Sequence, residues 1–246
     1  MSQSDHDLLA IEAATIYVLT DSGRILHKSS PDHDAGPRFR LASCASGNIV
    51  LVRHDVGESI AHAIEGLAAR EPALPPPDGA PVYLNEYRSF LAVEAPVESS
   101  DSGLIWTFPD RLDYDHPADL VRSDTPAGDR LLAGLTESGM PEALAKMGFV
   151  DVGEFWTPWC VALHGEEIAS IAFTVGLGHA SAEVGVATVP AFRGRGLAAA
   201  ATAGWASLKA NSERVLFYVA SRSNVSSHRV TQRLGLRPIG TDLTIA

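Results

Sequence analysis

The chain has 246 residues and a formal net charge of −11, with 46% hydrophobic and 20% charged residues. This composition is typical of a soluble globular protein, and the length predicts one large domain or two small ones. The acidic balance argues against a nucleic-acid partner, because binding to phosphates needs a basic surface. It weakly favours small cationic substrates, although solubility alone is the simpler explanation.

Membrane insertion, secretion and disulfide formation are not expected. A membrane span needs a run of about 18 apolar residues, and no run in this sequence approaches that length. The polar residues 1–6 do not resemble a secretory signal. The two cysteines, Cys44 and Cys160, lie far apart and outside any metal-ligand spacing. Each is therefore expected to be a buried thiol in a protein of the reducing cytoplasm, without a metal site.

The first half of the chain predicts a mixture of helices and strands without a chemical motif. Helices are expected at residues 7–14, 57–69 and 84–93, and strands at 17–20, 48–53 and 104–108. Three polar connections separate them: the proline-rich residues 71–81, the acidic and serine-rich residues 98–103, and residues 109–117, which are rich in Asp and Pro.

The second half alternates more regularly. We expect, in chain order, a strand at 120–123, helices at 126–135 and 142–147, and strands at 158–163, 167–175 and 182–189. A helix at 197–210, a strand at 215–220, a helix at 224–234 and a strand at 236–245 follow. This succession predicts a mixed α/β sheet. We divide the chain into an N-terminal α/β domain at 1–115 and a C-terminal domain at 116–246.

The most informative segment covers residues 183–198. A strand ends at Val189, Pro190 breaks it, and a glycine-rich turn opens directly into an Ala-rich helix. Such a turn is typical of an anion site, because glycines let the backbone approach the ligand and the first helical N–H groups lack partners. Arg193 and Arg195 add charges that suit a pyrophosphate, although both also fit a solvated surface. The spacing Arg-x-x-Gly-x-Ala is neither a dinucleotide fingerprint nor a P-loop.

Two motifs at the right mutual distance resemble the GNAT (GCN5-related N-acetyltransferase) superfamily. Val-Pro-Ala-Phe-Arg-Gly-Arg-Gly-Leu-Ala (189–198) is similar to the pyrophosphate signature of that family. Asn-Val-Ser-Ser-His-Arg-Val-Thr-Gln-Arg-Leu-Gly-Leu (224–236) is similar to its next helix, and Val-Arg-Ser-Asp-Thr-Pro-Ala (121–127) to its frequent first strand and helix start. The resemblance covers residues 118–246, the C-terminal half of the chain.

The resemblance implies that acetyl-CoA, or another short acyl-CoA, is the co-substrate and that no metal takes part. It implies a GNAT-like fold in which the strands at 182–189 and 215–220 splay apart, with acyl-CoA in the gap. The implied cofactor contacts come from the strand end, the glycine-rich turn and the next helix, and are Val186, Thr188, Val189, Arg193, Gly194, Arg195, Gly196, Leu197, Ala198, Asn224 and Ser227.

The implied reaction is direct acyl transfer to a primary amine within a ternary complex. An acidic residue often stands near the start of the corresponding strand in this family, so Glu183 is the candidate base, although a strand-edge carboxylate without a role fits the sequence equally well. The oxyanion donor is expected to be a backbone N–H near residues 186–188. The family often protonates the departing thiolate with a Tyr where this sequence has Thr231, which leaves Ser227, His228 or water for that role.

Several alternatives stay open. The chain could be a non-catalytic acyl-CoA-binding sensor or docking module, which the missing Tyr favours. Residues 1–115 could be a degenerate second GNAT-like half that has lost its phosphate loop.

A covalent route through Cys160 is disfavoured because this residue lies in an apolar strand. Phe155, Trp156 and Trp159 would either wall an acceptor pocket or belong to the core. The amine (on a small molecule or a peptide), the acyl-chain length and homodimer formation are also open.

Overall fold

The computed structural model describes residues 3–74 and 80–246, so part of the expected proline-rich connection, residues 75–79, lies outside the described residues. The chain divides into two compact units. The first comprises the residues up to Thr107 together with Val219–Val225 and Arg237–Ala246, and the second comprises Phe108–Tyr218 and Ser226–Leu236. Helices and strands occur together in both, which confirms the predicted mixed α/β fold class.

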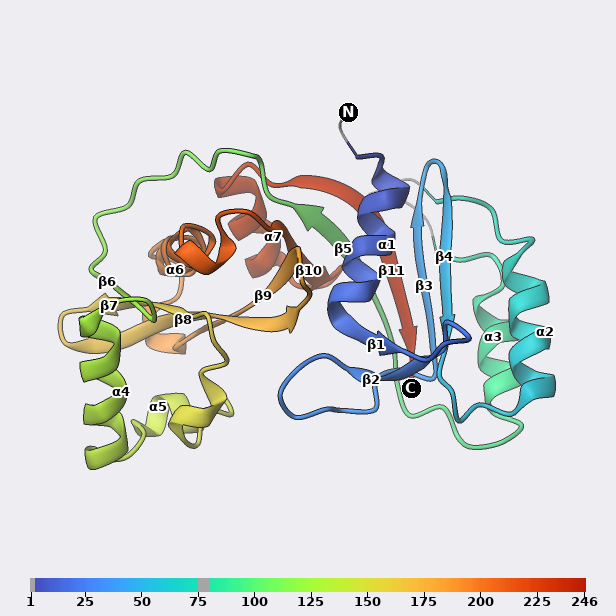
Figure 1. Ribbon diagram of the computed structural model, residues 1–246, viewed down its shortest axis with the longest axis horizontal. Coiled ribbons are helices and arrows are strands. Elements are labelled where there is room, and N and C mark those ends of the chain that lie inside the picture. Colours follow the sequence, from blue (N-terminus) through green and yellow to red (C-terminus); the bar gives the residue numbers. More distant parts are fainter. Residues whose placement is uncertain (1–2, 75–79) are drawn as a thin grey trace. The chain divides into compact units, whose positions relative to one another are not determined.

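The first unit contains an antiparallel sheet in which the C-terminal strand lies between strands of the N-terminal half (Figure 1). The strand order is β4-β3-β11-β5, with bounds Gly47–Val52, Phe39–Cys44, Arg237–Ile245 and Ser100–Thr107. Leu243 of β11 lies opposite Leu41 of β3 on one side and Ser102 of β5 on the other. A separate two-stranded sheet consists of β1 (Tyr17–Leu19) and β2 (Ile25–Lys28).

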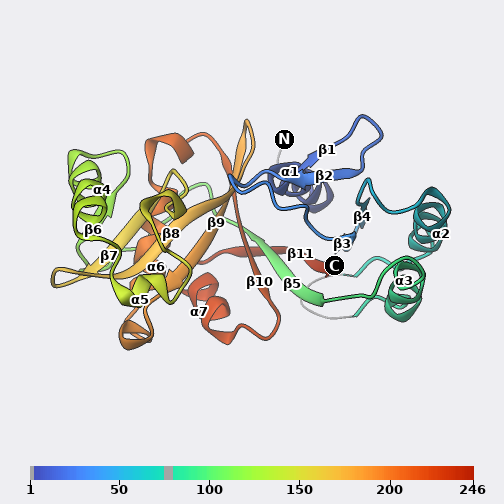
Figure 2. The ribbon, with the colours of Figure 1, turned by 90° about the horizontal axis from the view of Figure 1, so that it is seen from below.

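Helices α1 (Asp5–Ile16), α2 (Glu58–Ala68) and α3 (Leu84–Leu91) complete this unit. A capping box begins α1, because the Ser4 hydroxyl accepts the N–H of Asp7 while the Asp7 carboxylate accepts the N–H of Ser4. α2 and α3 lie side by side in Figure 2 and bury their apolar sides in one core with β3 and β11. The buried residues of this core include Phe39, Leu41, Val52, Ile64, Tyr87, Leu91, Leu243 and Ile245.

The first half of the chain departs from the sequence-based expectation at two places. The strand pattern does not predict β2 or β3, and the loop expected at 98–103 is wrong, because residues 100–103 begin β5. Asp101 lies opposite Thr244 of β11, so backbone pairing with a distant strand overrides the polar composition of this segment. The helices expected in this half are confirmed as α1, α2 and α3, with shifted ends.

The second unit contains a mixed sheet in which β6, β7, β8 and β9 are antiparallel neighbours and β10 runs parallel to β9. These strands span Leu120–Arg122, Cys160–His164, Glu167–Leu177, Ser181–Thr188 and Val215–Ser221. Helices α4 (Pro126–Ser138) and α5 (Glu142–Ala145) cover one face of the sheet, and α6 (Leu197–Ala206) covers the other (Figure 1). The predicted order of elements is confirmed through α7 (Val225–Arg233) to β11.

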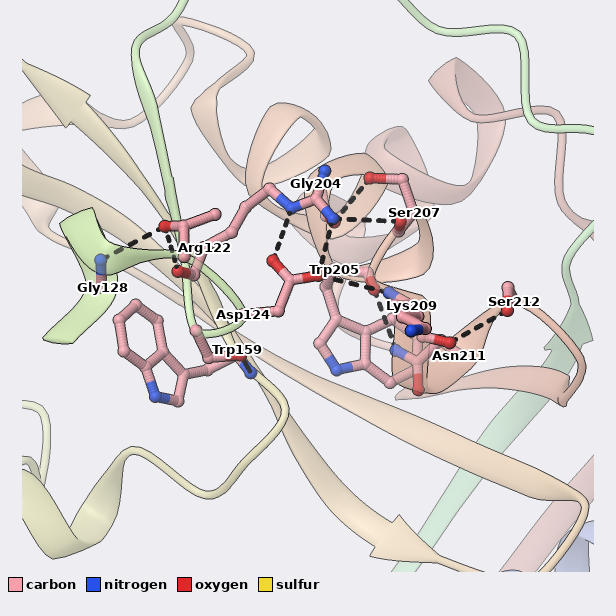
Figure 3. Close-up of polar contacts among 12 residues, drawn as sticks. Arg122, Asp124, Gly128, Trp159, Gly204, Trp205, Ser207, Lys209, Asn211 and Ser212 are labelled. Carbon is pink, nitrogen blue, oxygen red and sulfur yellow. Dashed lines mark hydrogen bonds and ion pairs between the residues drawn. The ribbon is translucent and has the colours of Figure 1, made fainter.

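A polar network joins the start of α4 to the end of α6, as Figure 3 shows. Arg122 and Asp124 form an ion pair at 2.8 Å. Arg122 also donates to the carbonyl oxygen of Ser207 at 3.3 Å, and the Asp124 carboxylate accepts the backbone N–H of Lys209 at 3.3 Å. The helix expected at 197–210 is shorter than predicted and ends at Ala206. A 3-10 turn at Lys209–Asn211 follows it, and the bond to Asp124 holds the first residue of this turn.

Candidate functional site

The candidate site is built around the turn between β9 and α6. A 3-10 turn at Pro190–Phe192 follows β9, and Gly194 and Gly196 then adopt left-handed backbone conformations with φ of +80° and +84°. Glycine suits these positions because it has no Cβ atom. Gly196 is the N-cap of α6 and has no side chain that could cap the helix, so the first N–H groups of α6 need another acceptor. An anion is such an acceptor, and the helix dipole favours its charge.

Two arginines of this turn are exposed to solvent. Nε of Arg193 donates to the carbonyl oxygen of Thr188 at 3.4 Å, and Nη1 of Arg195 donates to Nε2 of His164 at 2.9 Å. The Arg195 guanidinium also lies over the ring of Phe192, 5.7 Å from its centroid. Each guanidinium carries five N–H donors, so these single bonds leave donors that match phosphate oxygens.

Strand β9 changes character along its length. Ser181–Val184 are buried and pair with Val215–Tyr218 of β10, whereas Gly185–Thr188 are partly exposed and extend beyond that paired register. Val186 and Thr188, two of the expected cofactor contacts, lie in this second half. A strand edge beyond its paired neighbour can offer N–H and C=O groups to an extended ligand.

Glu183 lies in the buried half of β9 and is 8% exposed. In the sheet it lies opposite Phe217 of β10 and Gly176 of β8. At this point β8 contains a bulge between Thr174 and Gly176, which inserts Val175 into the ladder. Bulges redirect side chains and are over-represented next to active sites. Glu183 is thus a buried carboxylate beside an irregularity of the sheet.

Helix α7 carries the other expected catalytic residues. Ser227 and His228 are half-buried, and Asn224, just before the helix, is exposed. The Ser227 side chain hydrogen-bonds to the phenol of Tyr218, whose pKa is raised by burial. Thr231 is 3% exposed and donates its hydroxyl to the carbonyl oxygen of His228 at 2.9 Å. Its hydroxyl proton is therefore directed into its own helix.

The aromatic residues near the expected acceptor side are mostly core, and so are the two cysteines. Phe155 and Trp159 are buried in the core beneath α4 and α5, which confirms the core alternative for both, whereas Trp156 is half-buried. Both cysteines are buried free thiols, as expected. Burial raises the pKa of the Cys160 thiol to about 12, so this thiol is not ionised at neutral pH and does not supply a nucleophile.

The fold also brings to the turn two residues that the sequence motifs do not assign to it. Nε2 of His116 lies 3.1 Å from the carbonyl oxygen of Arg195, although 79 positions separate the two residues along the chain. A Cβ atom placed on Gly196 would lie 2.9 Å from Nε2 of His116 and 3.4 Å from Nη1 of Arg233. No local sequence pattern marks these contacts, because each joins segments far apart in the chain.

Metal clusters and membrane-spanning helices are both absent from residues 3–74 and 80–246, the part of the chain that the structure describes. This part of the chain contains no group of three or more His, Cys, Asp or Glu side chains that could hold a metal ion. None of its helices is long and apolar enough to cross a membrane.

Together, the mixed sheet and the turn before α6 define an α/β protein with a candidate anion site. Residues 159–241 match the model of a family described as GNAT acetyltransferase. The matched segment contains β9, the glycine-rich turn and α7, so the GNAT resemblance predicted for the C-terminal half is confirmed.

Solved structures of GNAT proteins resemble this fold at low sequence identity. A protein from Novosphingobium aromaticivorans assigned to the GNAT acetyltransferases is 23% identical over 61% of this chain and 65% of that chain, with a TM-score of 0.40. The match thus spans less than two thirds of the length of that protein. A GNAT-family acetyltransferase from Colwellia psychrerythraea is 11% identical over 99% of this chain and 97% of that chain, with a TM-score of 0.46.

A further structure is a diaminobutyrate acetyltransferase from Paenibacillus lautus in complex with L-2,4-diaminobutyric acid and coenzyme A. It is 16% identical over 52% of this chain and 95% of that chain, with a TM-score of 0.31. No curated protein sequence matches this chain.

Proposed function

We propose that this protein is an N-acyltransferase that moves an acetyl or other short acyl group from acyl-CoA to a primary amine by direct transfer. The observation that carries the proposal is the glycine-rich turn before α6, which lies inside the segment that matches the GNAT family. Uncapped helical N–H groups, two left-handed glycines and two exposed arginines meet in this turn. This combination fits the diphosphate of coenzyme A.

The chain's own groups would divide the binding of acyl-CoA between them. The turn at 193–198 would hold the diphosphate, and the partly exposed end of β9, with Val186, Thr188 and Val189, would contact the extended pantetheine. The contact expected for Asn224 rests on the family motif alone. Acyl-CoA itself supplies an acyl group activated as a thioester.

Glu183 is the proposed base. Its carboxylate would take a proton from the substrate ammonium, directly or through water, so that the free amine can attack the thioester carbonyl. The carbon–nitrogen bond forms as the carbon–sulfur bond breaks, and the departing thiolate takes up a proton from Ser227, His228 or water. The attacking nitrogen loses its second proton in the same step, and this proton replaces the one given to the thiolate. Backbone N–H groups near residues 186–188 would stabilise the oxyanion.

Calorimetric titration with acetyl-CoA tests the binding half of this proposal. Gly196→Ala should weaken affinity about tenfold or more, because a side chain at this left-handed position is strained and its Cβ meets His116. Gly134→Ala is the matched control, since a Cβ on Gly134 of α4 meets no atom of the described residues within 4 Å. Equal affinity for Gly196→Ala and wild type, or no binding by folded wild type, would contradict the proposal.

Turnover tests the chemical half. Thiol release from acetyl-CoA should be screened with polyamines, amino acids and lysine-containing peptides. With an accepted amine, Glu183→Gln should lower kcat about 10²- to 10⁴-fold, because the amide cannot take the proton. The affinity for acetyl-CoA should stay unchanged, since the amide has the same shape as the carboxylate. Full turnover by this variant would exclude Glu183 as the base.

A non-catalytic acyl-CoA-binding module is the second candidate function. The observation that favours it is Thr231, whose hydroxyl proton is directed into its own helix where the family often has a Tyr. Binding of acetyl-CoA that Gly196→Ala weakens, without thiol release for any amine in the screen, would support this candidate over the enzyme.

A further inference from the structure

His116 lies in the connection between β5 and β6, residues 108–119, which is the green segment leading to β6 in Figure 1. Its ring stacks on that of Tyr114, with centroids 6.3 Å apart and planes at 13°. Both ring nitrogens have partners. Nδ1 lies 3.1 Å from the backbone N of Ala118, and Nε2 lies 3.1 Å from the carbonyl oxygen of Arg195.

These two partners determine the tautomer of His116. The backbone N–H of Ala118 can only donate a hydrogen bond, so Nδ1 must accept it. The carbonyl oxygen of Arg195 can only accept, so the ring proton lies on Nε2 and is donated to that oxygen. The imidazole therefore acts as a directional link between its own segment and the glycine-rich turn.

The carbonyl group that His116 holds belongs to the peptide between Arg195 and Gly196. This peptide is planar and trans, so fixing the direction of its C=O group also fixes its N–H group on the opposite side. That N–H group directly precedes α6, where the candidate diphosphate site begins. The His116 ring also fills the space that a side chain at position 196 would need.

The Arg195 side chain is held separately. Nη1 of Arg195 donates to Nε2 of His164, which lies at the end of β7. The rings of His164 and Phe192 are in edge contact, with centroids 5.1 Å apart. Arg195 is thus held at its carbonyl by one segment of the unit and at its guanidinium by another.

We propose that His116 is a positioning residue that holds the glycine-rich turn ready to bind the diphosphate of acyl-CoA. This inference rests on the proposed function for the identity of the ligand. His116 would not contact the reacting atoms. It would strengthen binding because the turn is ordered before the ligand arrives, so less conformational entropy is lost on association.

Three histidine variants test the inference. His116→Ala should raise the Kd and the KM for acetyl-CoA about two- to tenfold, the range expected for one net hydrogen bond, with kcat at saturation unchanged. His116→Gln should restore most of the affinity, because its amide N–H can donate to the same carbonyl oxygen. His179→Ala, at an exposed position of the β8–β9 turn, is the matched control and should behave as wild type.

Hydrogen exchange supplies a readout that needs no ligand. The amides of residues 194–198 should exchange faster in His116→Ala than in wild type, and His116→Gln should return them towards the wild-type rate. If wild type, His116→Ala and His116→Gln have equal affinity for acetyl-CoA and equal exchange rates, His116 does not position the turn, while the proposed function stays intact. If wild type binds no acetyl-CoA, the proposed function fails, and the exchange rates still decide whether His116 positions the turn.

Discussion

In the first unit the guanidinium of Arg40 lies in the core between α1, β3 and β11, whereas in the second unit those of Arg193 and Arg195 are exposed in the turn before α6. Nε of Arg40 donates to Asp242 and Nη2 donates to Glu12, both at 2.6 Å. The exposed arginines make single bonds to a carbonyl oxygen and to a histidine ring. The core arginine is matched by carboxylates of its own chain, while the exposed pair is proposed to bind the diphosphate of acyl-CoA.

The two environments change what an arginine does. Burial alone would lower the pKa of Arg40, but the carboxylates of Asp242 and Glu12 raise it well above its ordinary value. The ring of Tyr17 lies 5.3 Å from the same guanidinium and adds a cation–π contact. Such an internally paired charge contributes to folding, and removing one partner leaves the others buried without compensation.

The largest effect is expected from breaking the buried network. Arg40→Met should lower the free energy of unfolding by about 3–5 kcal/mol, because the carboxylates of Glu12 and Asp242 would stay buried and charged. Denaturant titration measures this change. Arg88→Met, at an exposed position of α3, is the matched control and should stay within about 0.5 kcal/mol of wild type.

A further set of substitutions sharpens the same prediction. Adding Glu12→Gln and Asp242→Asn to Arg40→Met should recover part of the lost stability, because the uncompensated charges are then gone. Equal stability for Arg40→Met and Arg88→Met would show that the buried network does not stabilise the first unit.

The intermediate effect concerns the exposed arginines. Arg195→Ala should change the free energy of unfolding by less than about 0.5 kcal/mol, as expected for an exposed side chain. It should weaken acetyl-CoA binding about 10- to 150-fold, the loss expected for one charge-assisted hydrogen bond of about 1.5–3 kcal/mol. Calorimetry and denaturant titration on the same preparation separate the two results. If Arg195→Ala lowered the free energy of unfolding but left the affinity for acetyl-CoA unchanged, Arg195 would serve folding and not ligand binding.

The smallest effect is expected at the partly exposed ion pair of Figure 3. The hydrogen bond from Arg122 is the main cause that holds the pKa of Asp124 below its ordinary value. A carboxylate with a lowered folded-state pKa stabilises the protein above its unfolded-state pKa of about 3.9 and loses this contribution as the pH falls through the folded-state pKa. The side chains are 35% and 31% exposed, so the contribution is limited to about 1 kcal/mol or less.

Asp124→Asn should therefore destabilise the protein slightly at about pH 7, and the difference from wild type should shrink at about pH 3. Denaturant titrations at the two pH values measure it, with Asp119→Asn on the adjoining exposed loop as the control. A difference of the same size at both pH values would contradict an electrostatic origin.

How far the fold follows from local sequence differs between the two halves of the chain. The strands and helices of the second half are predictable because their apolar runs are long and Pro or Gly separates them. Strand β3 is not, because Arg40 and Ser43 interrupt its apolar pattern although the whole strand is buried. The partners that make Arg40 acceptable in the core lie 28 and 202 positions away, beyond any local pattern.

The sequence by itself determined the glycine-rich turn, its two arginines and the helix that follows, because glycine conformations and helix starts depend on neighbouring residues. Only the tertiary structure decided that β11 pairs with β3 and β5, that Glu183 lies beside a bulge of β8, and that His116 reaches Arg195. These contacts join segments far apart in the chain, and they form only when burial and backbone pairing bring those segments together.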